Sequence, residues 1–165
     1  MTTVAAMICA DGFVLGSDTK VVSGGTDIKW SANKIEVSTL GKSPLVIGGA
    51  GSLRHIQDAL KWMRIKELNN ILGIDASFDK FLDAVVEVEI PSFARDYRGK
   101  YETGLELEML IGCIDVDDKP RLVVVYSDGD YDHVNDIAAI GSGSIFGEMV
   151  VSRKWWKKES ACPTL

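Results

Sequence analysis

The sequence predicts an α+β protein in which helices pack on antiparallel sheets. Three observations favour this class. The apolar segments follow one another in the order strands, two helices, strands and a final helix, and such segregation is typical of α+β folds. The first two expected strands, over residues 4–9 and 13–15, are apolar on both faces, so a layer is expected on each side of their sheet. The length of 165 residues suits one domain with a sizeable core, and we expect a single domain over residues 1–165.

The chain is expected to begin with a β-hairpin. Residues 4–9 and 13–15 are apolar runs that predict two strands. Asp11-Gly12 lies between them and is a two-residue turn signal. A polar loop is expected after this hairpin.

Two further strands and a helix are expected next. Residues 34–37 alternate between polar and apolar, and residues 45–47 predict a short buried strand that Gly48 closes. A helix is expected over about 52–68, capped by the Ser52 hydroxyl, which can accept a bond from a free N–H of the first turn. Its apolar stripe, at steps of three or four residues, consists of Leu53, Ile56, Leu60 and Met63.

A second helix is expected to begin near Ser77. Pro91 is expected to end or kink it, because proline lacks a backbone donor and clashes with the preceding turn. The polar stretch 96–103 predicts a loop. The buried face of this helix is expected to hold Phe78, Phe81, Leu82 and Val85.

The last third of the chain predicts strands and a final helix. The turn signals are Asp117 to Pro120 and Ser127 to Asp130. A Gly-Ser-Gly-Ser run over 141–144 leads into a helix with Ile145, Met149 and Trp156 on one face. The strands are expected over residues 107–114, 122–126 and 137–140.

Charge and hydropathy exclude several classes of function. The net charge is −6, from 24 acidic and 18 basic residues, which argues against nucleic acid or an anionic membrane as the main partner. No stretch of roughly 18 apolar residues predicts a membrane span, and no signal peptide is recognisable. We therefore expect a cytoplasmic protein.

No cofactor or metal site is predicted. The three cysteines, Cys9, Cys113 and Cys162, are too widely spaced for a disulfide framework or a zinc knuckle. The segment 128–132 faintly resembles a calcium loop, but His133 stands where that loop needs glycine.

Thr2 is the first candidate for a catalytic residue. Removal of Met1 would leave a threonine that carries both a nucleophilic hydroxyl and a free α-amino group. Such an amine titrates at about 7.7–8.0, so at neutral pH a useful fraction is neutral and can accept the hydroxyl proton. Many proteins start with Met-Thr, so this signal is weak by itself.

Three further residues give Thr2 a catalytic setting. Asp18 ends the second strand of the hairpin, so its carboxylate can return to the start of the first strand. A lysine such as Lys34 lowers the pKa of a nearby hydroxyl, and an aspartate holds that lysine in place. The Gly48 N–H can approach a substrate carbonyl as an oxyanion donor. Each residue also has an ordinary explanation: the end of a strand for Asp18, a solvated charge for Lys34 and a turn for Gly48.

These residues together resemble a known family. Thr2-Thr3-Val4, Asp11-Gly12, Gly16-Ser17-Asp18, Lys34 and the run Ile47 to Gly51 are similar to proteasome β subunits and their bacterial relative HslV. Counted from Thr2, the residues Asp18, Lys34 and Gly48 fall on the family's acidic, lysine and glycine positions without a gap. The run 141–144 resembles the family's Gly-Ser-Gly motif, and this resemblance implies that Ser142 lies beside the nucleophile and its amino group.

The resemblance implies a fold and an activity. The fold is a four-layer α-β-β-α sandwich of two antiparallel sheets, that of the N-terminal nucleophile hydrolases. The activity is threonine endopeptidase cleavage of unfolded polypeptides, inside homo-oligomeric or mixed stacked rings that are usually fed by an ATP-dependent unfoldase. By family position, the pocket for the residue before the cut is lined by Val21, Ala32, Val46, Ala50 and Arg54, and it is expected to be mainly apolar.

The end of the chain bears on the alternatives. Family members continue with a helix and two strands, so a C-terminally short domain that lacks them is expected here. One alternative is an inactive structural ring subunit, which would follow if Met1 is retained or if this C-terminal segment is truly absent. Another is an N-terminal nucleophile amidase or peptide ligase, because the fold and the nucleophile do not fix the acyl acceptor.

Overall fold

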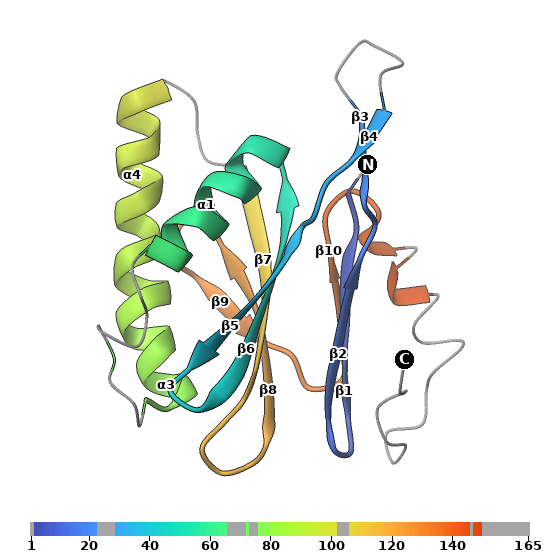
Figure 1. The fold of residues 1–165 in the computed structure, drawn as a ribbon, viewed down its shortest axis with the longest axis vertical. Coiled ribbons are helices and arrows are strands. Elements are labelled where there is room, and N and C mark those ends of the chain that lie inside the picture. Colours follow the sequence, from blue (N-terminus) through green and yellow to red (C-terminus); the bar gives the residue numbers. More distant parts are fainter. Residues whose placement is uncertain are drawn as a thin grey trace.

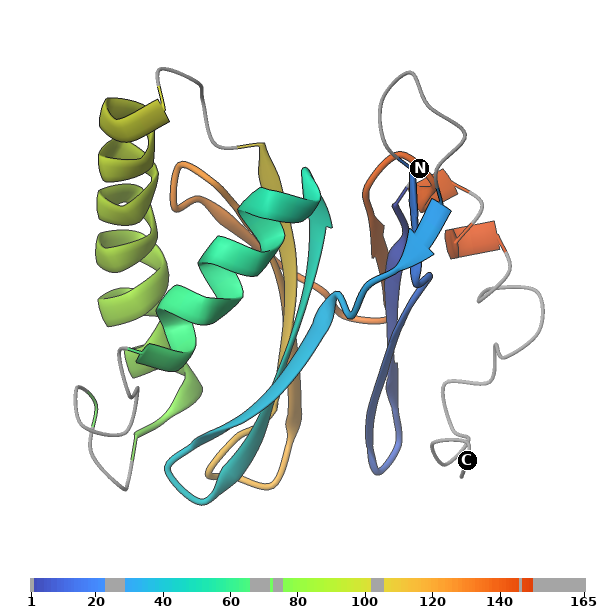
Figure 2. The same cartoon turned by 45° about the horizontal axis from the view of Figure 1, so that its top comes forward.

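Two antiparallel sheets face each other in the computed structural model, which describes residues 2–22, 29–65, 72, 76–101, 106–145 and 147–149. The smaller sheet has the strand order β10-β1-β2, the larger has the order β5-β6-β7-β8-β9, and β3 and β4 form a two-stranded ribbon. The longer helices lie on the outer face of the five-stranded sheet, and short helical pieces at 144–145 and 147–149 lie beside the smaller sheet (Figures 1 and 2). The strands are β1 (Val4–Cys9), β2 (Gly12–Ser17), β3 (Lys20–Val22), β4 (Lys29–Ser31), β5 (Ile35–Leu40), β6 (Ser43–Gly51), β7 (Leu107–Ile114), β8 (Pro120–Tyr126), β9 (Tyr131–His133) and β10 (Ile137–Ile140).

The N-terminal hairpin forms as predicted, with its turn one residue earlier. Cys9 pairs with Gly12, so the turn residues are Ala10 and Asp11. This register gives every residue of β1 a partner on β2. β1 is also paired with β10 on its other side, which makes it the central strand of its sheet.

Strand β6 is longer than the predicted 45–47 run. It continues past Gly48 to Gly51, because β7 supplies antiparallel partners for each of these last residues. β9 was not predicted: its three residues are half-buried or exposed, and only their pairing with β8 makes them a strand. The predicted strands over 107–114 and 137–140 are confirmed, and the strand predicted over 122–126 begins two residues earlier, at Pro120.

The first helix, α1 (Leu53–Ile65), packs on the larger sheet; the predicted residues 66–68 lie outside the described residues. The second helix begins at Phe78 as predicted, with the Ser77 hydroxyl accepting from the Lys80 N–H. It comprises α3 (Phe78–Phe81), the π-helical stretch η1 (Leu82–Glu89) and α4 (Ile90–Tyr101).

The expectation that Pro91 ends this helix is wrong. The wide turns of η1 directly precede the proline, and the Ile90 N–H reaches five residues back to the Val85 carbonyl oxygen. The helix therefore continues without a donor at Pro91. The loop predicted from residue 96 is also wrong as far as Tyr101, because Tyr97 is buried in the core and keeps this polar segment helical.

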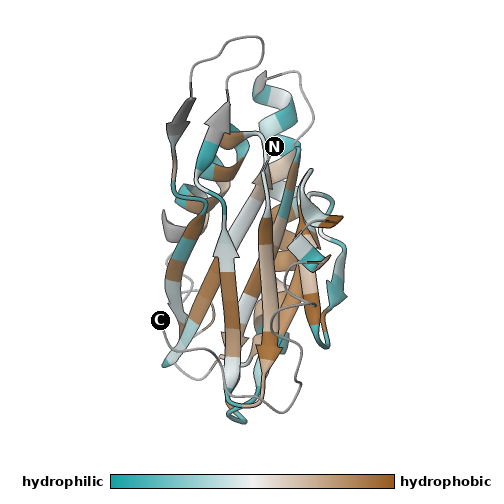
Figure 3. Ribbon diagram, turned by 90° about the vertical axis from the view of Figure 1, so that its right-hand side faces the viewer, coloured by the Kyte–Doolittle hydropathy of each residue, from teal (hydrophilic) through white to brown (hydrophobic). Residues whose placement is uncertain are grey.

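Hydrophobic side chains fill two layers of the sandwich. The larger layer lies between the helices and the five-stranded sheet, and the smaller lies between the two sheets. Figure 3 shows hydrophobic residues along the length of the strands. Close approach of the sheets depends on glycine at two positions. A Cβ at Gly48 would lie 2.6 Å from Val4 Cγ1, and one at Gly112 would collide with the Phe13 ring.

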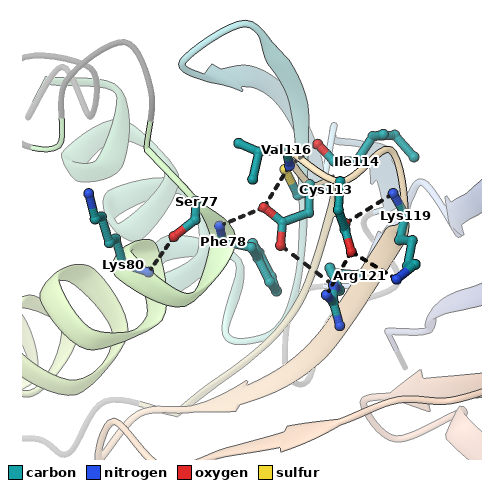
Figure 4. Close-up of polar contacts among 10 residues, drawn as sticks. Ser77, Phe78, Lys80, Cys113, Ile114, Val116, Lys119 and Arg121 are labelled. Atoms are coloured by element: carbon teal, nitrogen blue, oxygen red, sulfur yellow. Dashed lines mark hydrogen bonds and ion pairs between the residues drawn. The ribbon is translucent and has the colours of Figure 1, made fainter.

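A buried carboxylate joins α3 to the β7–β8 connection (Figure 4). Asp115 is 6% exposed. Its Oδ1 accepts from the Phe78 N–H at 3.0 Å and from the Val116 N–H at 2.8 Å, and its Oδ2 lies 3.5 Å from Arg121 Nε. Removing one partner of a buried charge destabilises the folded state strongly, because the remaining group is left buried and uncompensated. Asp115 therefore fixes the helix start to the sheet.

Asp115→Ala is expected to lower the free energy of unfolding by about 3 kcal/mol, because a buried N–H loses its acceptor and the Arg121 guanidinium loses its ion-pair partner. Urea unfolding with an unchanged m-value measures this loss. Asp117→Ala is the matched control: its exposed carboxylate lies 3.3 Å from the same Arg121, and a much smaller effect is expected. Equal losses in the two variants would contradict the anchoring role of Asp115.

Candidate active site

A buried lysine lies at the centre of the candidate site. Lys34 directly precedes β5 and is 1% exposed. Its Nζ donates to both carboxylate oxygens of Asp18 at 3.0 Å and to the Lys20 carbonyl oxygen at 3.0 Å. Three acceptors satisfy the three protons of the ammonium group, which is what burial of a charge requires. The structure therefore brings two of the predicted catalytic residues together and excludes a solvated position for Lys34.

Asp18 connects this lysine to the start of the chain. It follows β2, and its Oδ1 accepts from the Thr3 N–H at 2.7 Å, while its own N–H donates to the Thr3 carbonyl oxygen at 3.1 Å. Partial burial raises the pKa of the Asp18 carboxyl, but the bonds from the Thr3 N–H and the Lys34 ammonium outweigh it, so the pKa is lowered overall. The carboxylate is thus ionised at neutral pH, with its charge one residue from Thr2.

This lowered pKa predicts a pH-dependent stability. The unfolded value is about 3.9, so the contribution of ionised Asp18 is present above about pH 4 and is lost as pH falls through the lowered folded value. Asp18→Asn is expected to destabilise the protein at pH 7, and this difference should shrink towards pH 3.

Urea unfolding of both proteins at several pH values measures the effect. Asp58→Asn is a suitable control, because its carboxylate makes an exposed ion pair with Arg54 at 3.8 Å and is expected to matter little at any pH. A difference between wild type and Asp18→Asn that is equal at pH 3 and pH 7 would contradict the prediction.

Residues 141–143 hold Thr2 from the other side. The Thr2 N–H donates to Ser142 Oγ at 3.2 Å, and the Gly143 N–H donates to the Thr2 carbonyl oxygen at 3.3 Å. In the chain with Met1 this nitrogen belongs to a peptide bond; after removal of Met1 it would be the α-amino group. Gly141 has a φ of +87°, and a Cβ there would collide with the Thr2 carbonyl oxygen. The loop therefore needs glycine to approach Thr2 so closely.

Gly48 has a packing role that the sequence did not reveal. It pairs with Ile35 on β5 and Leu110 on β7, and the side chains of β1 and β2 fill the space where its Cβ would be. The neighbouring Gly49 N–H donates to the Lys34 carbonyl oxygen at 2.9 Å. Because N–H groups alternate between the two edges of a strand, the Gly48 N–H is directed towards β7. Its role as an oxyanion donor stays a prediction, with no support from the contacts of the described residues.

The five predicted substrate-binding residues lie in different surroundings. Ala50 is buried and borders a cavity with Thr2. Val46 is half-buried within β6, and Ala32 is half-buried, with its N–H bonded to the Thr19 carbonyl oxygen. Arg54 points to solvent on α1, with its side chain 64% exposed. The side chain of Val21 is outside the described residues.

The cavity beside Thr2 has a volume of about 900 Å³ and is bordered by acidic side chains. Ser142 and Ala50 lie on it with Thr2, and its carboxylates come from Glu106, Glu108, Asp128 and Glu148. Sequence analysis missed these residues, because only the fold brings the start of β7 and the segment after β10 together. The spacing Glu106-x-Glu108 at the start of β7 was the one available signal.

Two absences apply to the described part of the chain only. Within it, no group of three or more His, Cys, Asp or Glu side chains is arranged to hold a metal ion. None of the helices there has the length and apolar character needed to cross a membrane.

Comparison with solved structures shows the same fold elsewhere. The protein Anbu (ancestral beta-subunit) from Yersinia bercovieri superposes with a TM-score of 0.76 at 20% identity, over 96% of this chain and 68% of that chain. Anbu from Pseudomonas aeruginosa, described as a helical assembly of the Anbu complex, gives 0.75 at 21% identity with the same coverage. The Gly-1 mutant of Anbu from Hyphomicrobium sp. strain MC1 gives 0.77 at 18% identity, over 98% and 68%.

Sequence comparison shows the family. Comparison with curated proteins gave no match. The family model described as Proteasome subunit matches residues 1–162. The predicted family resemblance and the sandwich of two antiparallel sheets are confirmed. Because the match spans nearly the whole sequence, this chain belongs to the proteasome subunit family.

Proposed function

We propose that the protein is a threonine endopeptidase whose nucleophile is the Thr2 hydroxyl after removal of Met1. The observation that carries the proposal is the set of contacts at the start of β1. Asp18 bonds to the Thr3 N–H and to the buried Lys34 ammonium, while Ser142 bonds to the Thr2 nitrogen. A carboxylate that is paired with a cation thus contacts the residue after Thr2, and a hydroxyl contacts the Thr2 nitrogen. These contacts support an activated nucleophile at Thr2.

The proposed reaction has two steps. In the first, the Thr2 amine takes the hydroxyl proton, Oγ1 bonds to the substrate carbonyl carbon, and the peptide nitrogen leaves with a proton. This gives an ester between Thr2 and the acyl part of the substrate. In the second, water attacks the ester, the carboxylic acid product leaves and the hydroxyl is restored. Lys34 stabilises the developing negative charge on Oγ1 and Asp18 orients Lys34, while Ser142 positions the amine.

We also propose that the chain works in a multi-subunit assembly, on unfolded polypeptides delivered by an ATP-dependent unfoldase. The support is the family membership and the helical assembly described for Anbu from Pseudomonas aeruginosa. Light scattering coupled to size-exclusion chromatography is expected to give a mass several times the chain mass of 18.0 kDa. A monomer at micromolar concentration would contradict this part of the proposal.

Intact mass spectrometry, before and after a peptide epoxyketone, tests the activity. Such a probe reacts with a threonine hydroxyl and its free amine together, so loss of Met1 and one adduct are expected. A form with an uncleaved N-terminal extension, which keeps Thr2 in a peptide bond, is the control and should take no adduct. A free Thr2 without adduct would favour an inactive structural subunit. Adduct formation with transfer of the acyl group to an added amine would favour a ligase.

A further inference from the structure

A hydrogen bond links the five-stranded sheet to the start of the 141–143 segment, which contacts Thr2. Glu108 is on β7 of the five-stranded sheet, where it pairs with Ala50 and Tyr126. Its Oε2 accepts from the Gly141 N–H at 3.0 Å. Gly141 directly follows β10, which belongs to the other sheet. A carboxylate acceptor makes this a charge-assisted hydrogen bond, which is stronger than one between neutral groups.

Gly141 opens the segment that holds Thr2. The next two residues bind both backbone ends of Thr2, with Ser142 Oγ at its nitrogen and the Gly143 N–H at its carbonyl oxygen. The segment is tight: the Ser144 N–H donates back to the Gly141 carbonyl oxygen at 3.0 Å. A Cβ at Gly141 would also lie 3.0 Å from the Cβ of Ala50, which is the β6 residue that pairs with Glu108. Movement of Gly141 would therefore be transmitted to Ser142.

We infer that Glu108 is a positioning residue for Thr2, acting through Gly141 and Ser142. This inference rests on the proposed function and adds a residue that the family resemblance did not supply. Within the described residues the Glu108 carboxylate bonds to Gly141 and not to Thr2, so it acts by holding the 141–143 segment at a fixed distance from the five-stranded sheet. Glu108 also borders the cavity that Thr2 borders. The effect of its negative charge on that cavity must therefore be distinguished by experiment from the effect of its hydrogen bond to Gly141.

The test compares three variants by the rate of epoxyketone adduct formation at Thr2. Glu108→Ala is expected to slow the reaction about 10- to 100-fold with little change in probe binding, because displacement of a reacting group by about 1 Å costs this much. Glu108→Gln is expected to retain most of the rate, because its amide oxygen can still accept from Gly141. Glu106→Ala removes a carboxylate from the same cavity but no contact with the loop, and should react like wild type.

Hydrogen exchange of the 141–144 amides gives a readout that does not depend on chemistry. Exchange at Gly141 is expected to be faster in Glu108→Ala and close to wild type in Glu108→Gln. Loss of rate in Glu108→Gln or Glu106→Ala equal to that in Glu108→Ala would overturn the inference, because the charge of the cavity would then be the cause. Unchanged exchange in Glu108→Ala would also overturn it. A wild-type protein that takes no adduct would overturn the proposed function instead, and the exchange comparison would still decide the contact.

Discussion

Thr2→Ala is expected to lower the rate of peptide cleavage by at least about 10⁴-fold, the scale seen when the nucleophile of a hydrolase is removed. Alanine keeps the backbone contacts to Ser142 and Gly143 and lets Met1 be removed, so only the hydroxyl and one methyl group are lost. The measurement is the steady-state hydrolysis of a fluorogenic peptide, together with intact mass after the epoxyketone. The free energy of unfolding is expected to change little.

Thr2→Ser is the matched variant for this prediction. Serine keeps the hydroxyl and the free amine and removes one methyl group, so activity within about 100-fold of wild type is expected. Activity of Thr2→Ala equal to that of wild type would exclude Thr2 as the nucleophile. If Thr2→Ser loses as much activity as Thr2→Ala and still carries Met1, the loss would be explained by failed removal of Met1 and not by the change of nucleophile.

Lys34→Met is expected to reduce adduct formation about 10³-fold, because it removes the cation that stabilises charge developing on the Thr2 oxygen. The side chain is of similar length and the position is 1% exposed, so the packing volume is largely kept. Asp18 loses two of its bonds but keeps the Thr3 N–H. Epoxyketone kinetics measure the chemical effect, and urea unfolding measures the cost in stability.

A double variant separates these two effects. Asp18→Asn with Lys34→Met removes both charges, and we expect it to be more stable than Asp18→Asn alone, because no buried unpaired ammonium is left. Its reactivity is expected to stay as low as that of Lys34→Met. Recovery of reactivity together with stability would show that Lys34 is structural and would contradict its catalytic role.

The sequence predicted best where local pattern and packing agree. The β1–β2 hairpin and the start of the second helix follow from apolar runs, a turn and a capping serine, and all are present. Pro91 does not end the helix, because the π-helical turns before it already leave no helical donor needed at that position. Leu82, Val85 and Val86 of these turns are buried in the core. β9 was missed because three polar or half-buried residues carry no periodic signal.

The sequence likewise predicted only part of the candidate site. Asp18 and Lys34 were found because strand ends and a family pattern placed them near Thr2, and their contacts are present. The packing role of Gly48 could not be predicted, since it depends on where Val4 and Leu15 of another sheet lie. The contact between Glu108 and Gly141 joins residues 33 positions apart on different sheets. No local sequence pattern predicts a contact between residues so far apart in the chain.

The position of β1 has a consequence for the order of its first residues. Chain termini commonly fray, but β1 is hydrogen-bonded on both sides, with Val4 paired to Ile140 and to Ser17. Thr3 and Thr2 are then bonded to Asp18 and to the 141–143 segment. The proposed nucleophile, Thr2, therefore loses its conformational freedom when the protein folds rather than when a substrate arrives. Less entropy remains to be lost on the way to the transition state.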